Sequence, residues 1–115
     1  MARYAYYYLI KASTDCLQDI VAQVLEDCNL RITYKSEDYV MAQEPIGESP
    51  FNQLVKVEVL IHKSDMQNDK VKLTCVTKNG ELQLQNQNHC QRMAIKLQEV
   101  FRRTPRWQFV EQLNG

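Results

Sequence analysis

Residues 88–105, NHCQRMAIKLQEVFRRTP, decide the fold. The apolar side chains of this segment fall at helical spacing on one stripe: Cys90, Met93, Ala94, Leu97, Val100 and Phe101. Asn88 can cap the first turn, with Gln91 three residues later, and Pro105 stops the helix. We therefore predict a helix over 89–103 that ends the fold. A helix with one apolar stripe must bury it against another layer, so we expect the preceding residues to supply a sheet.

Alternating apolar and polar residues before this helix predict a series of short strands. The best of them is 54–62, in which Val55, Val57, Val59 and Ile61 share one face. The other expected strands are residues 4–11, 30–35, 39–44, 70–77 and, after the hairpin signal Asn79-Gly80, 81–85. Within 70–77 we expect Val71, Leu73 and Cys75 to face the core and Lys72 and Thr74 to face outward.

A second amphipathic segment, 14–28, follows the first strand and predicts another helix. Ser13 or Thr14 can cap its start, and Asn29 can stop it in a left-handed conformation. The pattern indicates a single α+β domain over residues 1–115: one antiparallel sheet of five or six strands with two helices on one face, in the order β-α-β-β-β-β-(β)-α. This element order resembles that of helix-grip and TATA-binding-protein-like folds. The resemblance lies in the order alone and implies no residue role or activity.

The charges balance over the whole chain but not along it. Fourteen Lys and Arg match fourteen Asp and Glu, which argues against a dedicated nucleic-acid binder and against a polybasic membrane anchor. Residues 1–50 hold four basic against eight acidic side chains, and residues 51–115 hold ten against six. We expect a dipolar molecule that can associate with itself or with a partner carrying one sign of charge.

The sequence favours a cytoplasmic protein with reduced thiols. No run approaches the roughly 20 apolar residues that cross a membrane, and the N-terminal residues lack the pattern of a signal peptide. The cysteines Cys16, Cys28, Cys75 and Cys90 form no C-x-x-C pair, and three of the four occupy expected core positions. Two disulfides in an exported protein are the alternative.

Three groups of residues suggest chemistry, and each has a simpler structural explanation. His89 and Cys90 at the start of a helix could form an activated thiol, but Cys90 belongs to the core stripe. His62 and His89 with cysteines could bind zinc, but their spacing lacks paired ligands. Glu58, Lys56 and His62 could transfer protons, or could form a solvated sheet face. We therefore predict a non-enzymatic protein without a metal or cofactor.

The favoured function is a protein-interaction or assembly module, which self-associates or docks a protein partner through its free sheet face. The loop 44–53, with Ile46 and Phe51, would take part, and Trp107 would either anchor a partner or fold back onto the sheet. The expected partner-binding residues are Ile46, Phe51, Leu54, Lys56, Leu60, Arg92, Lys96, Arg103 and Trp107.

Two alternatives remain open. The protein could bind a small molecule in a cavity between the sheet and the last helix, with the hydroxyls of Tyr4, Tyr6 and Tyr8 as polar contacts. It could also bind single-stranded nucleic acid on a basic and aromatic platform formed by Lys56, Lys70, Lys72 and tyrosines of the first strand. The neutral charge places nucleic acid third.

Overall fold

A computed structural model describes residues 1–13, 15–47, 50, 53–63, 70–81 and 88–113 of the chain. Its elements are β1 (Ala2–Lys11), α1 (Leu17–Asp27), β2 (Arg31–Ser36), β3 (Tyr39–Gln43), β4 (Lys56–His62), β5 (Lys70–Asn79), α2 (His89–Arg103) and β6 (Gln108–Leu113). Within this described part, the strands form one antiparallel sheet of six in the order β2-β3-β4-β5-β1-β6. The predicted α+β class and the order from β1 to α2 are confirmed.

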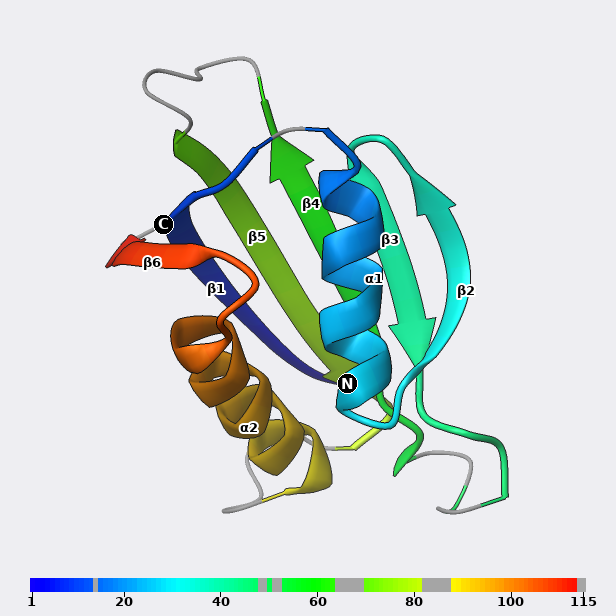
Figure 1. Cartoon of the computed structure of the whole chain (residues 1–115). Helices are drawn as coiled ribbons and strands as arrows, with labels where there is room; N and C mark the ends of the chain where they lie inside the picture. The colour runs from blue at the N-terminus through cyan, green and yellow to red at the C-terminus, as the bar shows by residue number, and fades with distance from the viewer. Residues whose placement is uncertain (14, 48–49, 51–52, 64–69, 82–87, 114–115) are drawn as a thin grey trace.

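Both helices lie on the same face of the sheet (Figure 1). The first helix, α1, packs on β2 and β3, whereas α2 packs on β1, β5 and β6. Tyr8 of β1 lies at the centre of the core, with its ring 5.5 Å from that of Phe101 of α2. Because the strands alternate, the opposite face of the sheet carries the other half of the side chains. No described element covers that second face, which we call the open face.

The last helix confirms the prediction made from its sequence. The Asn88 side-chain oxygen accepts a hydrogen bond from the backbone N–H of Gln91 at 2.7 Å, and Cys90, Ala94, Leu97 and Phe101 are buried. The helix ends when the backbone N–H of Thr104 donates to the carbonyl of Val100 at 2.9 Å, one residue before Pro105. Local sequence signals are therefore sufficient to specify α2.

The expectation that α2 ends the fold is wrong, because β6 follows it and pairs with β1. Trp107 directs the chain back toward the sheet. Its side chain is 6% exposed, and the centre of its ring lies 5.4 Å from that of Phe101. Its Nε1 also donates a hydrogen bond to the Phe101 carbonyl at 2.9 Å. The returning chain satisfies the backbone groups at the edge of β1. The sixth strand is thus the tail, and the strand expected at 81–85 falls largely outside the described residues.

The first helix starts later than predicted and has a different cap. It begins at Leu17, after Cys16 adopts a left-handed conformation with φ 58° and makes no side-chain capping bond. Ser13 instead accepts a hydrogen bond from the Asp15 N–H at 3.3 Å, and Thr14 lies outside the described residues. The predicted stop is confirmed, since Asn29 has φ 64°.

All four cysteines are free thiols, with Cys28, Cys75 and Cys90 buried and Cys16 exposed. The prediction that three of them face the core is confirmed. Burial raises the pKa of the Cys75 thiol to about 12, so it is uncharged at neutral pH. Neither helix in the described ranges combines the length and the apolar content that crossing a membrane requires.

We expect Trp107→Ala to destabilise the fold strongly, because it empties the contact that turns the tail onto β1. Truncating a buried aromatic side chain costs about 3–5 kcal/mol in free energy of unfolding, which urea denaturation monitored by circular dichroism would measure. Val110→Ala in the same tail is the control, because Val110 is exposed and its truncation is expected to cost less than about 0.5 kcal/mol. A similar small loss for both variants would show that Trp107 does not hold the tail.

Candidate functional site: the open face of the sheet

The open face carries most of the strand cations. Register and alternation place seven basic side chains there: Arg3, Lys11, Arg31, Lys56, Lys70, Lys72 and Lys78. The acidic side chains that the same criteria place on this face are Glu58 and Glu111. Lys72 pairs with His62 of β4, and Thr74 pairs with Leu60. Both lie on the face opposite to the buried Leu73 and Cys75, which agrees with the outward orientation predicted for them. A chain that is neutral overall therefore has one strongly basic surface.

Several of these cations lie directly opposite one another across neighbouring strands. Lys78 of β5 pairs with Lys56 of β4 on one side and with Arg3 of β1 on the other. Gln43 of β3 and then Arg31 of β2 continue this line to the edge of the sheet. We call these five residues the basic row. Like charges placed opposite each other destabilise a sheet, so the fold does not require this arrangement.

A second line of cations lies toward the other end of the strands. Lys70 of β5 is opposite Lys11 of β1, and Lys72 is in the adjacent position along β5, opposite both His62 and Leu9. We call Lys11, Lys70 and Lys72 the lysine rim. The open face thus has positive charge at both ends of the strands.

Apolar and aromatic side chains lie between the basic row and the lysine rim. One line crosses four strands in register, as Tyr39, Leu60, Thr74 and Tyr7. Tyr34 of β2 extends it, with its ring 5.9 Å from that of Tyr39 and its side chain 55% exposed. We call the band formed by Tyr7, Tyr34, Tyr39 and Leu60 the aromatic band. The sequence predicted a role for Leu60 and, in the nucleic-acid alternative, for the first-strand tyrosines that include Tyr7, but none for Tyr34 and Tyr39.

Two tyrosines of the aromatic band contact charged side chains of the open face. Lys72 Nζ lies 5.6 Å from the centre of the Tyr7 ring, which is a cation–π distance. Burial disfavours ionisation of Glu58, but the hydrogen bonds from Lys78, at 2.9 Å, and from Tyr39 outweigh it and hold the Glu58 pKa below its ordinary value. The carboxylate is therefore ionised at neutral pH and offsets part of the charge of the basic row.

A groove of about 740 Å³ opens beside the basic row and joins residues from four parts of the chain. Its apolar wall is formed by Met41, Ile46 and Leu54, and its polar wall includes Lys56 and Lys78. The structure thus brings together Ile46, Leu54 and Lys56 of the predicted partner-binding set. Ile46 is 74% exposed, and Phe51 lies outside the described residues.

The remaining members of the predicted partner-binding set are elsewhere. Arg92, Lys96 and Arg103 lie on α2, and so on the helical side of the sheet, where Arg103 Nε is 3.2 Å from Glu99. Trp107 is buried in the core and is not available as an exposed anchor. The predicted surface therefore separates into an open-face part and a helical part that do not meet.

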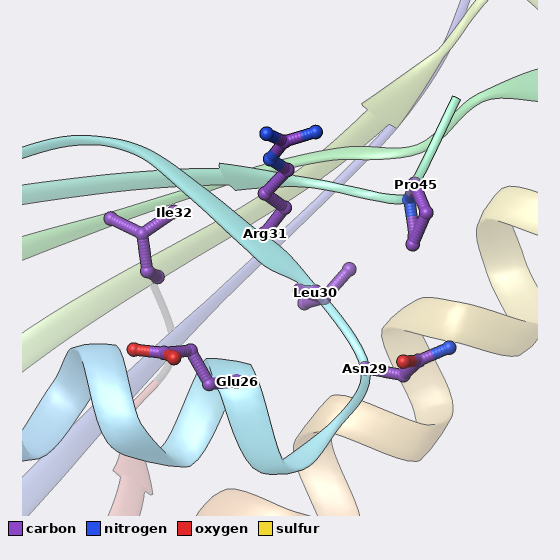
Figure 2. Close-up of a pocket in the computed structure, with 6 residues that line it drawn as sticks. All are labelled: Glu26, Asn29, Leu30, Arg31, Ile32 and Pro45. Atoms are coloured by element: carbon purple, nitrogen blue, oxygen red, sulfur yellow. The ribbon is translucent and has the colours of Figure 1, made fainter.

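A shallower pocket of about 470 Å³ lies between the end of α1 and the edge strand β2 (Figure 2). Glu26, Asn29, Leu30, Arg31, Ile32 and Pro45 line it. Figure 2 shows the Arg31 side chain extending away from α1, which agrees with its place in the basic row. The pocket contains one acidic and one basic side chain, without the convergent polar groups typical of a small-molecule site.

The predicted ligand-binding tyrosines of β1 belong to the helical side of the sheet. Tyr8 is buried, and burial raises its pKa far above the ordinary value. The Tyr4 hydroxyl accepts a hydrogen bond from the Asn88 side chain at 3.0 Å, and Tyr6 is half-buried beside Tyr8. Phe101 and Leu97 of α2 are buried in the same core, so side chains occupy the place where the alternative function expected a cavity.

A buried polar cluster surrounds the start of α2. Glu81 accepts hydrogen bonds from the N–H groups of His89, at 3.3 Å, and Cys90, at 3.0 Å, and from the Asn79 side chain at 2.6 Å. His89 Nε2 lies 2.8 and 2.9 Å from the two carboxylate oxygens of Glu44. The bonds accepted by Glu81 satisfy two of the unpaired N–H groups of the first helical turn, those of His89 and Cys90.

This polar cluster has the geometry of a helix cap. Cys90 is fully buried, and burial together with the charges of Glu81 and Glu44 raises the pKa of its thiol to about 12, so the protonated form prevails at neutral pH. His62 contacts Thr74 at 3.0 Å on the open face and does not join His89. Among the described residues, no group of three or more His, Cys, Asp and Glu side chains could hold a metal ion.

Glu81→Gln should destabilise the protein by about 1–2 kcal/mol at pH 7, because one carboxylate oxygen at the helix start is lost. Burial opposes ionisation of Glu81, but the bonds from Asn79, Cys90 and His89 outweigh it and lower its pKa. A lowered pKa stabilises the folded state above the unfolded-state pKa and loses that effect as the pH falls through the folded-state value.

The difference between the wild type and Glu81→Gln in urea denaturation should therefore shrink from pH 7 to pH 3. Glu99→Gln is the matched control, since Glu99 lies on the exposed side of α2 and its ion pairs contribute less than about 1 kcal/mol. An equal difference at both pH values would rule out a role for the ionised Glu81 carboxylate.

Comparison of the chain with protein-family models, with curated proteins and with solved structures finds no match. The candidate site is therefore defined by the register of the strands. It consists of the basic row, the lysine rim and the aromatic band between them.

Proposed function

We propose that the protein is a non-enzymatic binding module that receives a negatively charged partner on the open face of its sheet. The observation that carries the proposal is the line Lys56–Lys78–Arg3, in which three cations lie opposite one another on adjacent strands. Lys70 opposite Lys11 repeats the pattern at the other end. Such pairs weaken a sheet, so a partner that neutralises them accounts for their presence better than folding does.

The same charges disfavour symmetric self-association through this face. In a two-fold dimer each copy presents the same patch to the other, so the basic row and the lysine rim of one copy would face those of its partner. Glu58 and Glu111 are too few to compensate. A second copy could bind only through a different surface, such as the acidic residues Asp19, Glu26 and Asp27 of α1.

Three further observations support binding rather than catalysis in the described part of the chain. The side chains best suited to acid–base chemistry, Glu81, Glu44 and His89, are engaged at the start of α2. The Cys90 thiol is protonated, and the helical side of the sheet is filled by core residues. We expect the module to act in the cytoplasm, where the exposed Cys16 stays reduced.

Retention on a sulfated polyanion, immobilised heparin, tests the proposal. The double variant Lys56→Gln/Lys72→Gln should elute at clearly lower salt than the wild type, because it removes one cation from the basic row and one from the lysine rim. The control, Lys96→Gln/Arg103→Gln, makes the same change of charge on α2 and should elute close to the wild type. Equal shifts in the two doubles would place the binding charge outside the open face and overturn the proposal.

Removing one of the opposed cations should not weaken the fold. Lys56→Gln relieves the repulsion from Lys78, so its free energy of unfolding should be equal to that of the wild type or higher by up to about 1 kcal/mol. Lys96 lies on α2 and has no place in the pairs of opposed strand cations. Lys96→Gln should therefore leave the free energy of unfolding unchanged within about 0.5 kcal/mol. Urea denaturation at low salt measures both. A destabilised Lys56→Gln would show that the basic row contributes to folding.

A further inference from the structure

We infer that the negatively charged partner is a single-stranded nucleic acid, an assignment that rests on the function proposed above. The open face combines two features that such a ligand needs at once. Cations of the basic row and the lysine rim lie along both ends of the strands, and aromatic rings lie between them. Single strands are bound by positively charged surfaces that follow the backbone and by side-chain rings on which bases stack.

The aromatic band has the dimensions for more than one base. Tyr39 and Tyr7 are in register across β3, β4, β5 and β1, so three strand spacings of about 4.8 Å separate them by roughly 14 Å. Leu60 and the buried Thr74 lie in register between the two tyrosines, and Tyr34 lies beyond Tyr39 at the edge, with its ring 5.9 Å away. Sheet platforms of about four strands stack two or three bases.

The cations are within reach of a backbone that follows this band. On the side of the basic row, Glu58 and Val76 directly flank the aromatic band. Lys56 lies two positions beyond Glu58 along β4, and Lys78 lies two positions beyond Val76 along β5. Lys72 is next to the band on the opposite side, with its ammonium group over the Tyr7 ring. A base that stacks on this face of Tyr7 would displace the ammonium group from the ring, which leaves Lys72 beside the base for the adjoining phosphate.

The neutral total charge of the chain does not oppose this assignment. The carboxylates of α1, Asp19, Glu26 and Asp27, lie in the helical layer on the opposite side of the sheet, and Asp19 and Asp27 pair there with Lys35 and Arg106. Packed layers are about 10 Å apart, whereas screening at physiological salt acts over about 8 Å. A ligand on the open face therefore experiences mainly the local cations.

The aromatic band distinguishes a nucleic acid from other anions. An acidic peptide requires cations but gains little from three tyrosine rings on one face, of which Tyr34 is exposed and Tyr7 and Tyr39 are partly buried. A duplex carries the same phosphates, yet its bases are stacked on one another and cannot lie on those rings. Binding that depends on the rings as well as on the cations is the property that separates a single strand from both.

Fluorescence anisotropy with labelled 12-nucleotide oligo(U) and oligo(dT) tests the inference. We expect binding that weakens with salt, with a slope of log affinity against log salt near −3, as about four phosphate contacts on a single strand would give. Tyr7→Leu should weaken binding about tenfold, whereas Tyr7→Phe keeps the ring and should stay within about twofold of the wild type. Tyr34→Leu and Tyr34→Phe provide a second pair at an exposed edge position, where folding is not at risk.

Two further ligands separate the possible failures. A 12-residue poly-glutamate peptide and a 12-base-pair duplex should bind more weakly than the single strands and should show no difference between the Leu and Phe variants. The nucleic-acid assignment would be overturned if poly-glutamate bound as strongly as the oligonucleotides and the Leu and Phe variants had equal effects. The proposed binding-module function would still stand in that case if the heparin result holds. No binding of either oligonucleotide would also overturn the assignment. The fluorescence of the buried Trp107 confirms that each variant is folded.

Discussion

The pairing of β1 with β5 is the constraint on which the rest of the structure depends. The two strands are in register from Ala2 opposite Asn79 to Lys11 opposite Lys70, over their full length. This pairing connects the β2–β3–β4 side of the sheet, covered by α1, to the β6 side, covered by α2. A shift by one residue would exchange the two faces of β1, bringing Lys11 into the core and Tyr8 out of it. The core and the open face are therefore fixed by the same set of hydrogen bonds.

Local patterns in the sequence were enough to predict those helices and strands that bury a regular stripe of apolar side chains. The alternation of Val57, Val59 and Ile61 specified β4, and the periodic apolar residues with the Asn88 cap specified α2. The start of α1 was missed because Cys16, which takes a left-handed conformation without a capping bond, has no sequence signal of its own. The tail was not predicted to form a strand, because β6 alternates poorly and depends on the free edge of β1 for its hydrogen bonds.

The candidate site was harder to predict than the fold, for a physical reason. Alternation within one strand showed that Lys72 and Thr74 point outward, and the same signal could have included Lys78. It could not show that Arg3, Lys56 and Lys78 lie opposite one another, because their pairing joins residues far apart in the chain. Summing charges by sequence halves concealed the result: the acidic first half still contributes Arg3, Lys11 and Arg31 to the basic surface.

Glu58 offsets part of the positive charge on the open face. Its ionised carboxylate holds Lys78 at 2.9 Å and accepts from Tyr39, so it connects the basic row to the aromatic band. One carboxylate carries a single negative charge beside three opposed cations, so Glu58 offsets the charge of the basic row only in part. In the proposed complex, an anion would approach Lys56 while Glu58 keeps its contact with Lys78. An anion bound as proposed would therefore add to the contact that Glu58 already makes and would not have to replace it.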